Sequence, residues 1–131
     1  MKTKPLIGML LIIVTAPTFA GNKQAPEKTH GISAETLQSN ALGPQINAMQ
    51  GYDFRSRRVT IEPGGATNEH SHAERPGIVY VEQGKIIEYR NGTKKTYKPG
   101  DTWVEKADTV HWVYNKTKKP VVLIITDIIK Q

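Results

Sequence analysis

Short apolar runs separated by turn residues dominate the chain from residue 52 onward. Their length and their β-branched and aromatic content favour strands, and no segment there has the period of an amphipathic helix. We predict strands at residues 54–62, 78–82, 85–90, 93–97, 102–105, 109–114 and 120–129. Strands that recur about every ten residues, with turn signals such as Asn91-Gly92 between them, predict an all-β sandwich or barrel. The apolar run at residues 121–125 predicts a last strand buried on both faces.

The first fifty residues have a different pattern. An apolar run at residues 6–14 follows two lysines and precedes small residues at positions 18 and 20. This run is shorter than the roughly 20 residues that span a bilayer, and the arrangement is typical of a secretory signal peptide. We therefore predict a signal peptide at residues 1–20, an irregular lead-in at residues 21–50 with a helical turn at 35–38, and a β-barrel domain at residues 51–131. The expected location is periplasmic or secreted, without stable membrane anchoring after cleavage.

Composition narrows the class of protein further. The 131 residues are 37% hydrophobic and 23% charged, which is typical of one globular domain. The chain has no cysteine, which excludes disulfides, thiol nucleophiles and cysteine-ligated metal sites. The net charge of +6 falls to +4 once the two lysines of the predicted signal peptide are removed. The remaining lysines lie near predicted turns and strand ends without interleaved aromatic residues, so we expect no nucleic-acid partner.

Histidines carry the candidate chemistry. His70 and His72 are two residues apart, a spacing that places both imidazoles on the same face of an extended strand. Imidazole is a common ligand of divalent transition metals. A pair of surface or core histidines without a metal is the alternative interpretation of this spacing. His30 lies in the polar lead-in, where we expect a surface position.

The glycines and histidines around this pair resemble the cupin superfamily. The residues that carry the resemblance are Gly64, His70, His72 and Gly84 for the first cupin motif, and Gly100, Asp101, His111 and Asn115 for the second. The resemblance covers about residues 54 to 127 and implies a small jelly-roll barrel. It also implies that His70, His72 and His111 converge inside the barrel on one divalent transition metal ion. Iron, manganese, nickel, zinc and copper all accept imidazole ligands.

The sequence departs from the cupin pattern at one ligand position. Gly77 stands where the family has a glutamate ligand. Three alternatives follow. The metal is held by three neutral histidines with open positions for water or substrate, or Glu74 or Glu105 supplies the carboxylate instead, or the site is weak or vacant. A site without the carboxylate keeps more positive charge on the metal and favours an anionic ligand. Arg75 is a candidate substrate-binding residue that clamps a carboxylate, or else it pairs with an acid at the surface.

The resemblance implies two classes of function for an exported single-domain cupin. One is a metal-dependent enzyme of the dioxygenase or isomerase kind that acts on a small molecule. The other is a non-catalytic module that binds a small molecule or a metal, and an interaction module with a relict site is a further alternative. No catalytic base or nucleophile with a partner is evident, so the residues do not identify a reaction. A homodimer is expected by analogy with cupins.

Overall fold

The computed structural model describes residues 23–131, and within that part almost all regular structure is β. The elements are β1 (His30–Ala41), η1 (Asn47–Met49), β2 (Tyr52–Ala66), β3 (His70–Ser71), β4 (Gly77–Gln83), β5 (Ile86–Arg90), β6 (Thr93–Tyr97), β7 (Thr102–Glu105), β8 (Val110–Tyr114) and β9 (Val121–Lys130). Strands β4 to β9 differ from the predicted ranges by at most one residue at each end. β2 is longer than predicted and extends to Ala66.

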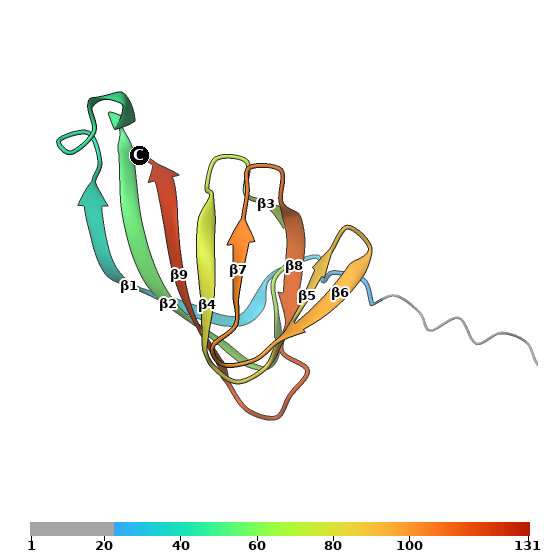
Figure 1. Cartoon of the computed structure of the whole chain (residues 1–131). Helices are drawn as coiled ribbons and strands as arrows, with labels where there is room; N and C mark the ends of the chain where they lie inside the picture. Colours follow the sequence, from blue (N-terminus) through green and yellow to red (C-terminus); the bar gives the residue numbers. More distant parts are fainter. Residues whose placement is uncertain (1–22) are drawn as a thin grey trace, which may run out of the picture.

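These strands curl into a nearly closed barrel (Figure 1). Neighbouring strands pair in the order β6-β5-β8-β2-β9-β4-β7, with β1 added to β2 and β3 added to β8. The two long strands β2 and β9 pair from Tyr52↔Lys130 to Ile61↔Val121, which is the longest continuous pairing without a register shift in the described sheet. Each pairing is antiparallel, as expected for a barrel built from short connections. The predicted all-β barrel is therefore confirmed.

Alternation along the strands places the apolar core inside the barrel. In β4, Val79 and Val81 are fully buried, whereas Ile78 and Tyr80 are exposed. The last strand does not match the prediction of burial on both faces. Its inward residues Val121 and Leu123 are buried, but the outward residues between and beyond them are only half-buried. Among residues 23–131, no second layer of strands covers the outer side of β9, which agrees with the partial exposure of its outward side chains (Figure 1).

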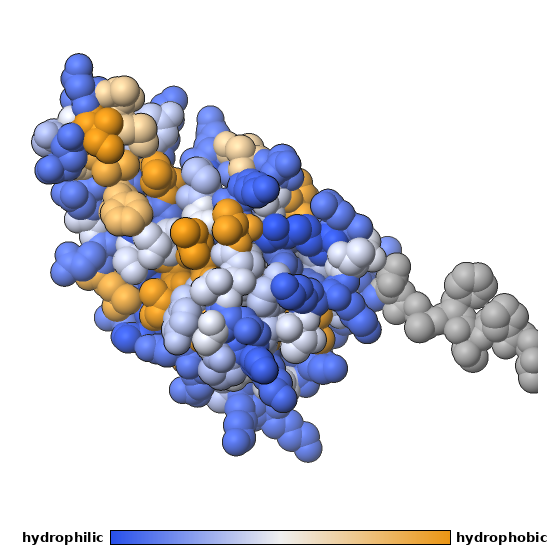
Figure 2. Space-filling model, viewed as in Figure 1, coloured by the Kyte–Doolittle hydropathy of each residue, from blue (hydrophilic) through white to orange (hydrophobic). Residues whose placement is uncertain are grey.

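The outer face of β4 and β7 is notably apolar. Ile78 and Val104 are cross-strand partners with 54% and 50% of their surface exposed. Figure 2 shows apolar side chains in the middle of this face, surrounded by hydrophilic ones. Within residues 23–131, no helix is long and apolar enough to cross a lipid bilayer.

The lead-in corrects one sequence-based expectation. Residues 30–41, expected in an irregular segment with a helical turn at 35–38, form the twelve-residue strand β1. This strand pairs with β2 along most of its length, for example Ile32 with Ile61. Only Ile32 and Leu37 are half-buried, and the other residues are exposed. An edge strand with so little burial carries no alternating apolar pattern, which is why the sequence did not reveal it. The predicted signal peptide lies outside the described residues.

Candidate metal centre

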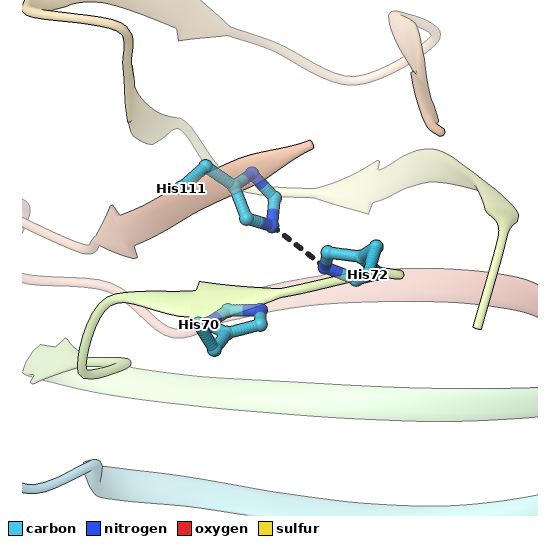
Figure 3. A group of neighbouring side chains, drawn as sticks. All are labelled: His70, His72 and His111. Atoms are coloured by element: carbon cyan, nitrogen blue, oxygen red, sulfur yellow. Dashed lines mark hydrogen bonds between the residues drawn. The ribbon is translucent and has the colours of Figure 1, made fainter. Parts of the chain in front are cut away.

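Three histidines from two distant segments meet inside the barrel (Figure 3). His70 lies in β3, His72 follows that short strand, and His111 lies in β8. Because β3 pairs with β8, His70 and His111 are direct register partners. The ligand atoms of the three imidazoles lie within 4.8 Å of one another. His72 and His111 are buried and His70 is partly buried, so the cluster faces the interior.

Other histidine and motif residues have different places. His30 is exposed on β1, and its ring nitrogens lie 3.2 Å from the backbone oxygens of Lys28 and Gly64. Asn115, a residue of the second cupin-like motif, is fully buried. Its side-chain amide donates to the backbone oxygens of Ile61 and Lys119. Asn115 therefore fixes the turn after β8 and does not point to the cluster.

Hydrogen bonds on the far side of each ring determine which nitrogen is free. His70 Nδ1 lies 2.9 Å from the backbone oxygen of Asn68, and His72 Nδ1 lies 3.2 Å from that of Arg75. A carbonyl oxygen only accepts hydrogen bonds, so both Nδ1 atoms carry the proton. The Nε2 atoms of these neutral rings then keep their lone pairs. The local backbone thus selects the tautomer that binds a metal through Nε2.

Glu88 performs the same task for His111. This carboxylate of β5 is 4% exposed, and its Oε1 accepts from His111 Nδ1 at 2.6 Å. Arg90 and the hydroxyl of Tyr97 also donate to Glu88. Burial alone would raise the pKa of Glu88, but the hydrogen bonds from His111 and Arg90 lower it overall. The ionised carboxylate holds the proton of His111 on Nδ1 and leaves Nε2 free. Sequence analysis missed Glu88, whose only signal was an acid in the middle of a strand.

The donor set fits a divalent metal ion. His72 Nε2 and His111 Nε2 lie 3.0 Å apart. Burial lowers the pKa of His72 to about 4 and also lowers that of His70, which favours neutral rings with a free Nε2 lone pair at both positions. Two nitrogens each about 2.1 Å from one ion, at a right angle, would be about 3.0 Å apart. A cation between the two Nε2 atoms is therefore a partner that suits the lone pairs of both rings.

Of the two candidate carboxylates, the structure brings Glu105 to the cluster. Glu105 is 5% exposed, and its two oxygens lie 3.1 Å from His72 Nδ1 and 3.6 Å from His111 Nε2. Burial raises the pKa of this carboxyl. Glu74 is exposed in the turn that follows His72, because the strand carrying the histidines ends at Ser71.

Glu105 also lies beside position 77, where the resemblance to cupins implies a glutamate ligand. It is the register partner of Gly77 in the β4–β7 pair, and side chains of such partners share a face of the sheet. A Cβ atom on Gly77 would lie 2.8 Å from the backbone oxygen of Thr126 and 3.1 Å from Cβ of Asp127. Position 77 therefore has no room for a ligand side chain. The carboxylate beside the histidines comes instead from the neighbouring strand.

The histidines face a cavity of about 350 Å³ inside the barrel. Its wall combines the polar groups of the cluster with apolar side chains of β2, β8 and β9, among them Val59, Ile61, Val113, Leu123 and Ile125. Arg75 lines the same cavity, and its Nε lies 3.9 Å from the buried carboxylate of Asp127. From the sequence, the alternative partner of Arg75 was an acid at the surface, whereas Asp127 is buried. A volume of this size suits one small molecule beside the histidines.

Comparison with protein families decides the assignment. Residues 57–127, more than half of the chain, match the model of the Cupin_2 family, described as Cupin domain. The protein belongs to the cupin family. The stretch that matches begins in β2 and ends in β9, so it contains all three histidines. No curated protein matches the sequence significantly.

Solved structures with low sequence identity share the cupin fold. A predicted oxalate decarboxylase from Thermotoga maritima has a TM-score of 0.60 and 18% identity, over 75% of this chain and 80% of that one. KdgF from Halomonas sp. has a TM-score of 0.60 and 20% identity, over 80% and 87%. A Cupin 2 conserved barrel domain protein from Salinispora arenicola has a TM-score of 0.57 and 17% identity, over 82% and 88%. At these identities the likeness concerns the fold alone.

Proposed function

We propose that this cupin binds one divalent transition metal ion through Nε2 of His70, His72 and His111, and that it acts on a small molecule in the adjoining cavity. The observation that carries the proposal is the set of three imidazoles whose Nδ1 atoms are engaged elsewhere and whose ligand atoms lie within 4.8 Å of one another. Glu105 supplies a carboxylate within reach of the same point. When bound, such an ion acts as a Lewis acid toward a coordinated molecule.

The protein's own residues prepare this site. Backbone oxygens of Asn68 and Arg75 orient two imidazoles, and Glu88 orients the third. Such outer hydrogen bonds set the tautomer and strengthen the ligand. Apolar side chains line part of the same cavity. An enzyme of the dioxygenase or isomerase kind is the proposed class.

Metal titration of the mature protein tests the metal site. After treatment with EDTA, the protein is titrated with Ni²⁺, Zn²⁺ or Mn²⁺ by calorimetry, and the metal in the untreated protein is identified by mass spectrometry. We expect about one tightly bound ion per chain. His70→Ala removes one ligand from a partly buried position, and we expect it to weaken binding by more than the 10–100-fold typical of losing an outer-shell partner.

His30→Ala is the matched control, because His30 lies on β1 and outside the cluster. It should bind metal like the natural protein. Equal affinities for all three proteins would overturn the three-histidine site. Turnover of a small acid that depends on both the metal and His70 supports an enzyme, whereas tight metal binding without turnover of any tested compound supports the non-catalytic alternative.

We also propose that the protein is exported, to the periplasm or beyond the cell. The charged start, the apolar run at residues 6–14 and the small residues before position 21 support this proposal. Terminal sequencing of the protein from a periplasmic or medium fraction should give a chain that begins at Gly21. A chain found in the cytoplasm with the apolar run still attached contradicts the proposal.

A further inference from the structure

A second polar cluster lies inside the same barrel and is built around Asp127. This carboxylate of β9 is 1% exposed. Arg55 donates to both of its oxygens at 3.0 Å, and Arg57 donates to Oδ2 at 2.8 Å. Arg75 approaches the same oxygen at 3.9 Å. Three guanidinium groups thus surround one carboxylate, so Asp127 balances only one of the three positive charges.

Two of these arginines face the cavity that holds the histidines. Arg57 and Arg75 both line it, together with His70, His72 and His111. The Nε–H group of Arg57 is buried and has no hydrogen-bond partner among the described residues. Burial and the neighbouring arginines lower the pKa of Arg57, and Asp127 only partly opposes this. Buried donors normally have acceptors, so the Nε–H group of Arg57 lacks an expected partner.

We infer that the cavity binds a small aliphatic carboxylic acid, whose carboxylate contacts Arg57 and Arg75 while the rest of the molecule extends toward the histidines. The orientation toward the histidines rests on the proposed metal site, whereas the carboxylate contact rests on the arginines alone. Guanidinium groups bind carboxylates with paired hydrogen bonds, which suits donors that Asp127 does not use.

Charge and size both limit the ligand. Three arginines surround the one carboxylate of Asp127, so positive charge is left on this wall before any metal is added. A carboxylate on the ligand offsets part of that charge. The volume of about 350 Å³ lies at the lower end of the range for ligand cavities, which is roughly 300–1,000 Å³. The apolar wall that includes Ile61 and Leu123 accepts a short hydrocarbon part.

The test compares butyrate with butyramide, which has nearly the same shape and no charge. Both are titrated by NMR into the mature protein, once after EDTA treatment and once after loading with Zn²⁺. We expect butyrate to bind at least 10-fold more tightly than butyramide in both forms. Arg75→Gln should weaken butyrate by about 10- to 100-fold, the loss expected for charge-assisted hydrogen bonds.

Arg58→Gln is the matched control. Arg58 is next to Arg57 in β2 but points outward, where it pairs with Glu35 and Glu82. It should bind butyrate like the natural protein. Arg57→Gln is less informative, because Arg57 also forms an ion pair with Asp127 at 2.8 Å. Arg75 lies 3.9 Å from the same acid, so Arg75→Gln is the variant that tests the carboxylate site.

The outcomes separate the inference from the proposed function. Equal affinity for butyrate and butyramide, or an unchanged affinity in Arg75→Gln, overturns the carboxylate site even if Zn²⁺ binds at the histidines. Preferential binding of butyrate that is lost in Arg75→Gln, in a protein that takes up no metal, supports the carboxylate site and overturns the metal site.

Discussion

The histidine cluster and the arginine cluster share one cavity but have opposite hydrogen-bonding needs. In the histidine cluster every Nδ1 donates to a protein acceptor, and the Nε2 lone pairs are left over. In the arginine cluster three guanidinium groups surround the single carboxylate of Asp127, and donors are left over. Surplus acceptors suit a cation, and surplus donors suit an anion. The barrel therefore has a cation-binding side and an anion-binding side within one interior.

The two clusters are joined across three neighbouring strands. In the described sheet, Gly77 of β4 pairs with Glu105 of β7 on one side and with Asp127 of β9 on the other. Register partners point to the same face, so these two acids flank the glycine inside the barrel. Glu105 lies against the histidines and Asp127 lies against the arginines. The missing side chain at position 77 leaves room for Asp127, whose Cβ atom would lie 3.1 Å from a Cβ atom at that position.

Removing the charge of Asp127 breaks the arginine cluster and should have the largest effect. Asp127→Asn leaves three partly buried guanidinium groups without their counter-ion, which costs roughly 3 kcal/mol of unfolding free energy, the lower end of the range for breaking a buried ion pair. Urea denaturation measures the change, with Asp108→Asn in an exposed turn as the control, expected within about 0.5 kcal/mol of the natural protein. A loss below about 1 kcal/mol would show that the arginines do not need this acid.

A glutamate at position 77 tests whether the space between Glu105 and Asp127 can hold a side chain. Gly77→Glu puts a Cβ atom 2.8 Å from a backbone oxygen, so the strands must shift. We expect a loss of stability of about 1–3 kcal/mol, as for other overpacked interiors, and no gain in metal affinity. Denaturation and metal titration of the same variant provide the measurement. Tighter metal binding at unchanged stability would contradict the steric argument.

Glu88→Gln tests whether the hydrogen bond from His111 to Glu88 strengthens metal binding by the histidine cluster. The amide keeps the shape of the side chain but removes the charge that holds the proton on His111 Nδ1. We expect metal affinity to fall by about 10–100-fold, as for other outer-shell partners of ligating histidines. Calorimetric titration with Zn²⁺ measures it. Glu62→Gln, at an exposed position of β2, is the control and should leave the affinity unchanged.

Removing a surface arginine should change the unfolding free energy least, because its ion pairs are exposed to water and those of Asp127 are not. Arg58 pairs with Glu35 at 3.8 Å and with Glu82 at 3.6 Å, and all three side chains are more than 40% exposed. Such pairs contribute about 0–1 kcal/mol because water screens them. Arg58→Ala should therefore change the unfolding free energy by less than about 1 kcal/mol. A larger loss in urea denaturation would mean that the outer face of β2 is more tightly organised than its exposure indicates.

Parts of this site were readable from the chain because they depend on residues close together in sequence. The spacing of His70 and His72 predicts a shared face without knowledge of the fold. The glycine and histidine pattern led to His111 only through its resemblance to cupins. The choice between Glu74 and Glu105 was left open, because it depends on whether the short strand continues past His72. That strand ends at Ser71, and Glu74 falls in the turn.

The sequence by itself determined the strands β4 to β9, since alternation and turn residues are local properties of consecutive positions. It also determined which histidines are candidate ligands. Only the tertiary structure decided that β1 is an edge strand, that Glu88 meets His111, and that Asp127 meets the arginines. These contacts join segments far apart in the chain. They follow from the register between strands, which no short stretch of sequence encodes.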